Sequence, residues 1–93
     1  MTTLHNVLEM IDTYLYCILD IDENTGIWRN GSTTMTRDDI TYELYLLVNE
    51  NWTLLIRNGI NHNILQDMID IKNLTKGQAQ FYRYYFETIQ YRQ

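Results

Sequence analysis

Apolar residues recur at intervals of three and four along the first part of the chain, which is the spacing that lines one face of an α-helix. Within residues 3–19 they are Leu4, Val7, Leu8, Ile11, Leu15 and Ile18. The pattern predicts a helix over this range. Thr2 or Thr3 can cap its start, because a hydroxyl oxygen accepts one of the free N–H groups of the first turn.

The helical pattern stops at residues 20–35. Turn-forming residues are frequent in this segment, namely Asp20, Asp22, Asn24, Gly26, Asn30, Gly31 and Ser32. We expect a long structured loop here, or a short β-hairpin around Asn24–Gly26. Trp28 is one of the few apolar residues in the segment, and we expect its side chain to pack at the edge of the core and hold the loop.

A second helical stripe follows Thr36, which can cap a helix whose first turn carries Asp38 and Asp39 at the positive end of the helix dipole. The stripe consists of Ile40, Leu44, Leu47, Val48, Leu55 and Ile56. This pattern predicts one long helix that ends at Asn58–Gly59, since glycine tolerates the left-handed conformation beyond a helix end. A kink near Asn49–Asn51 is the alternative to a straight helix of this length.

Two further helices complete the pattern. Asn61 or Asn63 can cap a helix that runs to Lys72, and Thr75 with Gln78 has the spacing of a capping box for a helix from residue 76 onward. The predicted core stripe of that helix is Phe81, Tyr82, Tyr85, Phe86 and Ile89. The sequence therefore predicts an all-α fold, a small four-helix bundle in a single domain over residues 1–93, with the loop or hairpin at residues 20–35.

The charge of the chain is unevenly distributed. Residues 1–71 carry three Arg against eleven Asp and Glu, whereas residues 72–93 carry four Lys and Arg against Glu87 alone. We interpret this reversal as a basic C-terminal helix docked on an acidic body. The net charge of −5 does not favour a phosphate-backbone partner, so nucleic acid is not the expected ligand. We also expect no membrane span, and a cytoplasmic location in the cell that makes or hosts the protein.

The residue types of catalytic and metal sites are present but scattered. His5, Cys17 and His62 have no metal-ligand spacing, and Asp20–Gly26 departs from the pattern of a calcium loop. The carboxylate pairs Asp38/Asp39 and Asp67/Asp70 fit a helix start and a polar helix face, respectively. We therefore expect no enzyme, no cofactor and no metal.

The leading hypothesis for function is a non-catalytic protein-binding module. Its acidic face would consist of Asp20, Asp22, Glu23, Asp38 and Asp39, and would compete for a basic groove by imitating phosphates. Abundant Asn, Ile and Tyr with a single Ala is a composition that fits an AT-rich source such as a phage or mobile element. The expected partner is then a host enzyme or defence complex that the chain inhibits, as anti-CRISPR-like proteins do.

The last helix offers two alternatives. Tyr84 and Tyr91 lie seven positions apart, off the core stripe and beside arginines, which suits a protein interface or the contact surface of a self-assembling subunit. Residues 63–83 have the general layout of a helix-turn-helix. In that alternative Lys76, Gln78, Gln80 and Arg83 would contact DNA in the major groove.

Overall fold

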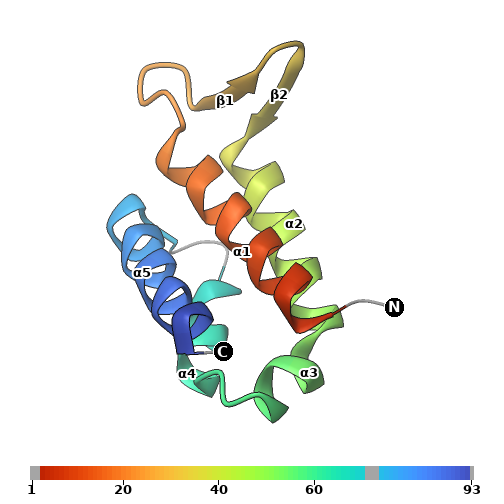
Figure 1. Cartoon of the computed structure of the whole chain (residues 1–93). Coiled ribbons are helices and arrows are strands. Elements are labelled where there is room, and N and C mark those ends of the chain that lie inside the picture. Colours follow the sequence, from red (N-terminus) through yellow and green to blue (C-terminus); the bar gives the residue numbers. More distant parts are fainter. Residues whose placement is uncertain (1–2, 71–73, 93) are drawn as a thin grey trace.

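Helix α1 (Leu4–Leu19) lies at the centre of the molecule, with α5 (Lys76–Arg92) on one side and α2 (Arg37–Glu50) on the other (Figure 1). This computed structural model describes residues 3–70 and 74–92, the last three of them as backbone only. The remaining elements are a β-hairpin of β1 (Ile27–Asn30) and β2 (Thr33–Thr36), and the short helices α3 (Trp52–Arg57) and α4 (His62–Met68).

The prediction of a mostly helical chain with a structured segment at residues 20–35 is confirmed. The finer prediction of a four-helix bundle is not clearly met, since the described residues form five helices and two of them are short. Over the same residues, no helix combines the length and the apolar character needed to cross a membrane.

Helix α1 supplies the middle of the core. Its predicted stripe is buried from Val7 to Ile18, and the side chains of Leu8, Ile11 and Leu15 are fully inaccessible to solvent. The Thr3 hydroxyl accepts a hydrogen bond from the backbone N–H of Asn6 at 3.2 Å, which confirms one of the two predicted caps. The helix starts where the sequence predicts because both the cap and the stripe are local signals.

The turn of the β-hairpin lies later in the chain than the Asn24–Gly26 position that the sequence indicated. Residues 22–26 form a tight turn, but the two strands reverse at Gly31–Ser32, because Asn30 pairs with Thr33. Gly31 has a φ of 62° while no non-glycine residue in the described part has a positive φ, which is the pattern of a type II′ turn. Trp28 pairs with Met35, and both pack against the core, as predicted for Trp28.

The long helix predicted after Thr36 is divided in two at Asn51. The Asn51 side-chain amide donates a hydrogen bond to the backbone oxygen of Leu47 at 2.8 Å, and its backbone leaves the helical conformation with φ −109° and ψ 18°. Asparagine disrupts a helix in this way because its side chain competes for backbone groups. The Thr36–Asp39 capping box starts α2, and Gly59, with a φ of 82°, follows α3 as predicted.

Helix α4 starts at the predicted cap, where Asn61 accepts hydrogen bonds from two backbone N–H groups, but it ends at Met68, which is earlier than predicted. The predicted end at Lys72 lies outside the described residues. Thr75 and Gln78 form the predicted capping box of α5. The Tyr85 hydroxyl accepts a hydrogen bond from the Asn61 backbone N–H at 2.9 Å, which ties α5 to the start of α4.

One face of α5 closes the core with Ala79, Tyr82 and Phe86, all of them buried. Phe81 was predicted to belong to this face, and that prediction is wrong, since 58% of its surface is exposed. The helix also docks through charge. Arg83 pairs with Asp12 of α1 at 2.9 Å, and Lys76 donates to the backbone oxygen of Ile21 at 2.8 Å, so the expected basic helix on an acidic body is present.

Candidate functional site

All five predicted partner-binding carboxylates gather at the hairpin end of the molecule. Asp22 forms a β-bridge with Ile27, and Ile27 in turn pairs with Thr36. Neighbouring strands are about 4.8 Å apart, so Asp22 and Thr36 lie about 10 Å from each other on either side of Ile27. The segment from Asp20, which ends α1, through the turn at residues 22–26 that holds Asp22 and Glu23 is here called the acidic turn. It is thereby brought next to the first turn of α2, which carries Asp38 and Asp39.

These carboxylates are exposed, but they differ in whether they already accept a hydrogen bond within the protein. Asp22 accepts a hydrogen bond from the backbone N–H of Asn24, and Asp39 accepts one from the N–H of Thr36. Both therefore have a structural role in the turn and in the helix cap. The carboxylates of Asp20 and Asp38 accept no side-chain or backbone hydrogen bond from the residues that the structure describes.

Cations lie at the same end. Glu23 pairs with Lys76 at 3.4 Å, while Arg29 is on β1 and Arg37 is the first residue of α2. The five carboxylates outnumber these three cations, so the surface is acidic but mixed. The predicted acidic face therefore includes positive charges from Arg29, Arg37 and Lys76.

The residues of the DNA-binding alternative are largely occupied by internal contacts. Arg83 is held by Asp12 and lies over the ring of Tyr16 at 5.2 Å, and Lys76 is bound to Ile21 and Glu23. Gln78 accepts a hydrogen bond from the N–H of Thr75 in the capping box. Of the four predicted DNA-contacting residues, Gln80 is exposed and has no such internal contact among the described residues.

The connection between the two helices of that alternative also differs from a helix-turn-helix. Residues 69–70 and 74–75 lie outside both helices, with three further positions between them, whereas the turn of such a motif has about three to four residues in all. In a helix-turn-helix over residues 63–83 the turn would contain Asn73, which lies outside the described part. The geometry gives this alternative no support.

The outer face of α5 carries large exposed side chains. Tyr84 is 70% exposed, and Phe81, three positions earlier, is 58% exposed. Residues three apart lie on the same helix face, so the two rings form one aromatic surface that points away from the core. The side chain of Tyr91, the other predicted interface residue of this helix, lies outside the described part of the chain.

Reactive side chains are few. Cys17 is buried, and burial, followed by the negative charge of Asp20, raises the pKa of its thiol, so the thiol stays protonated at neutral pH and is a poor nucleophile. His5 is exposed and pairs with Glu9, and His62 packs edge-on against Trp52. Within residues 3–70 and 74–92 there is no cluster of three or more His, Cys, Asp or Glu that could hold a metal ion.

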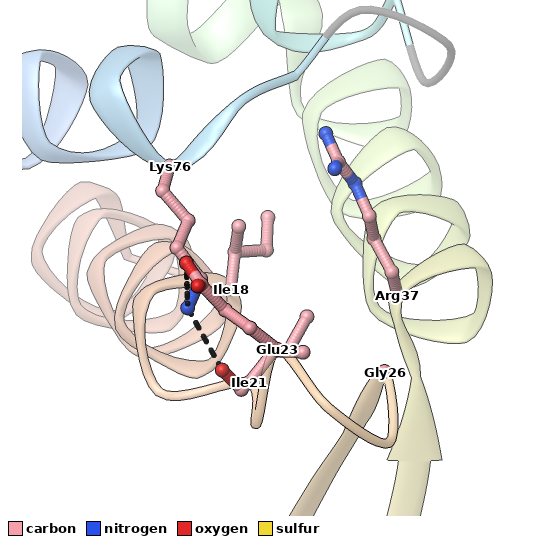
Figure 2. Close-up of a pocket in the computed structure, with 6 residues that line it drawn as sticks. All are labelled: Ile18, Ile21, Glu23, Gly26, Arg37 and Lys76. Carbon is pink, nitrogen blue, oxygen red and sulfur yellow. Dashed lines mark hydrogen bonds and ion pairs between the residues drawn. The ribbon is translucent and has the colours of Figure 1, made fainter.

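A hollow of about 270 Å³, which no pattern in the sequence predicted, lies beside the acidic turn. Figure 2 shows Lys76 and Arg37 on opposite walls, with Ile18, Ile21 and Glu23 between them. Arg37 is the first residue of α2 and was not among the predicted site residues. No sequence signal could have placed it here, because the hollow exists only where the start of α5 packs beside residues 18–26 and the start of α2.

Comparisons of the chain with models of protein families, with curated proteins and with solved structures gave no match. The candidate surfaces are therefore inferred only from the sequence and structure of this chain.

Proposed function

We propose that the chain is a non-catalytic protein-binding module that uses its hairpin end to cover a basic surface on a partner protein. The observation that supports this proposal is the lateral pairing of Asp22, Ile27 and Thr36, which brings two acidic segments to one end of the molecule. Negative charge concentrated on one surface speeds association with a basic partner and fixes its orientation.

Asp20 and Asp38 are the residues on which this contact depends most, because the other three carboxylates already hold a turn, a cap or Lys76. The cations among them make the surface selective. A partner must offer acidic or neutral groups opposite Arg29 and Arg37 as well as basic groups opposite the carboxylates, since like charges in contact are costly.

In biological terms, the module would be an accessory protein of a phage or mobile element that inhibits a host enzyme or defence complex. It would do so by occupying a groove that normally holds nucleic acid. The composition of the chain, rich in Asn, Ile and Tyr with one Ala, fits an AT-rich source of this kind.

The test is a quantitative pull-down from host lysate at low salt with the wild-type chain and two double variants of equal charge. The D20N/D38N variant removes the two unoccupied carboxylates. The E50Q/D67N variant removes two exposed carboxylates from other parts of the molecule. We expect a partner that wild type and E50Q/D67N retain, that D20N/D38N loses by at least about tenfold, and that duplex DNA displaces.

Equal retention by D20N/D38N and wild type would exclude the hairpin end as the contact surface. Loss with both double variants would show a general effect of net charge. Retention that added DNA does not reduce would leave protein binding in place and remove the nucleic-acid groove from the proposal.

The outer face of α5 supports a second candidate function, a self-assembling subunit, because Phe81 and Tyr84 are both more than half exposed. Burying such rings against a second copy would be favourable. Sedimentation at two protein concentrations separates this candidate from a monomeric binder. The candidate predicts a larger species at the higher concentration, which F81S/Y84S abolishes; a monomer at both concentrations would contradict it.

A further inference from the structure

The hollow beside the acidic turn has opposed cationic walls and an apolar floor. Lys76 comes from the start of α5 and Arg37 from the start of α2, while Ile18 and Ile21 come from the end of α1 and the residues after it (Figure 2). We propose that this hollow binds a carboxylate attached to a small apolar group, either a free organic acid or the C-terminal residue of a peptide.

Both cations have hydrogen-bond donors to offer. The ammonium group of Lys76 has three N–H donors, and the protein occupies two of them, through the backbone oxygen of Ile21 at 2.8 Å and the carboxylate of Glu23 at 3.4 Å. The guanidinium of Arg37 makes no hydrogen bond or ion pair with the residues that the structure describes. Its planar N–H groups match the two oxygens of a carboxylate.

Glu23 shows that the hollow accepts a carboxylate. Its side chain is 81% exposed, whereas the Lys76 side chain is 37% exposed, so the carboxylate reaches the ammonium from the solvent side. An ion pair this exposed contributes only about 0–1 kcal/mol. A ligand carboxylate that contacts Lys76 can therefore displace Glu23 at small cost, and the positive charge of Arg37 on the same hollow favours it further.

The floor and the size of the hollow define the rest of the ligand. Ile18 and Ile21 are buried aliphatic side chains that favour an apolar group over a second charge. The volume of about 270 Å³ lies below the range of about 300–1,000 Å³ typical of drug-sized ligands. An aliphatic group the size of one side chain fits these limits, whereas a nucleotide does not.

This inference does not rest on the proposed function. The contact with a partner protein depends on Asp20 and Asp38, which do not line the hollow, and the ligand titration below contains no partner protein. Either proposal can fail while the other holds.

The experiment is an NMR titration of the ¹⁵N-labelled chain with N-acetyl-leucine, which has the carboxylate and the apolar group, and with N-acetyl-leucinamide, which lacks the charge. We expect N-acetyl-leucine to shift the amides of residues 18–26, 37 and 76 with a Kd on the order of 1 mM, and the amide to leave them unchanged. A tetrapeptide ending in leucine distinguishes the sources. Binding at least about tenfold tighter than N-acetyl-leucine indicates a chain end, and equal affinity indicates a free acid.

Two pairs of variants test the roles of the walls. R37Q should weaken binding by at least about fivefold, whereas R57Q, the same charge change on an exposed residue of α3, should not. E23Q should tighten binding by about two- to fivefold, because it removes the competing carboxylate, and D20N should do so less.

Equal shifts with N-acetyl-leucinamide would overturn the proposal, as would an unchanged Kd in R37Q or equal weakening by R37Q and R57Q. Equal tightening by E23Q and D20N would remove Glu23 as the competitor. Inorganic phosphate that shifts the same amides as strongly as N-acetyl-leucine would show that the apolar floor is not recognised and would also overturn the assignment.

Discussion

The helical body and the hairpin end of this protein are built in opposite ways. In the body, α1 is buried between α2 and α5, and side chains such as Leu8, Leu15 and Phe86 are fully inaccessible. In the hairpin, no side chain is fully buried, and the half-buried Trp28 has an indole N–H without an acceptor among the described residues. An unpaired buried donor costs about 1–3 kcal/mol.

This difference separates stability from recognition. Apolar burial is the dominant favourable term in folding, and it is concentrated in the helices. The hairpin end combines exposed carboxylates, exposed cations and a small hollow, which are features of a surface that contacts other molecules. Substitutions should therefore affect the two regions in different ways.

The largest expected effect is in the body. Leu15→Ala should lower the free energy of unfolding by about 2–5 kcal/mol, because it leaves a cavity at a fully buried position of α1. Met10→Ala, at a position of the same helix that is 44% exposed, should cost less than about 1 kcal/mol. Urea denaturation monitored by circular dichroism measures both. A loss below about 1 kcal/mol for Leu15→Ala would mean that the core is not centred on α1.

The border between the two regions should show an intermediate effect. Thr36 ends β2 and caps α2, so Thr36→Ala should cost about 1 kcal/mol through loss of the hydrogen bond to the Asp39 N–H. Thr34→Ala, on the exposed surface of the same strand, should cost less than about 0.5 kcal/mol. The same denaturation experiment compares them. Equal costs would show that strand pairing, and not the cap, makes Thr36 important.

Charge pairing should contribute less still. A double-mutant cycle of D12N and R83Q should give a coupling free energy of about 0.5–1 kcal/mol, because this pair is bidentate although each side chain is 37% exposed. The cycle of E23Q and K76Q should give less than about 0.5 kcal/mol, since Glu23 is 81% exposed. Both couplings should fall as salt is added. A stronger coupling for Glu23 and Lys76 would reverse the comparison between body and hairpin end.

The smallest expected effect is a dependence of the free energy of unfolding on pH. Burial, and then the charge of Asp67, raise the pKa of Tyr82, and burial also raises that of Cys17, so both groups are held protonated in the folded body. Stability from a raised pKa is complete below the unfolded-state value and is lost as pH rises through the folded-state value. We expect the free energy of unfolding to fall above pH 9.0, the ordinary value for Cys17, and to fall less steeply in Y82F/C17A. Identical slopes in wild type and variant would contradict this assignment.

Local signals in the sequence predicted the helices well. The caps at Thr3, Thr36, Asn61 and Thr75 are all present, because each requires only a side chain and a backbone N–H a few residues away. The division at Asn51 was foreseen only as a kink, since the competing hydrogen bond to Leu47 depends on the chosen rotamer.

Features that depend on distant segments could not be predicted. Helical spacing placed Phe81 on the same broad stripe as Tyr82 and Phe86, but it could not show how much of that stripe neighbouring helices would cover. The partners of Lys76 and Arg83 lie 55 and 71 positions away, and no spacing rule relates them. The same limit applies to the candidate surfaces, because the hollow and the acidic end exist only through tertiary contacts.

The packing of α5 on α1 has a consequence for the order in which the protein is made. Helix α1 leaves the ribosome before α5, yet α5 covers one side of its apolar stripe and is synthesised about 70 positions later. Until then, the nascent chain keeps that side of α1 open to water or to a chaperone. The native fold can therefore be completed only after residues 76–86 have left the exit tunnel, which makes a stalled or prematurely released chain prone to aggregation.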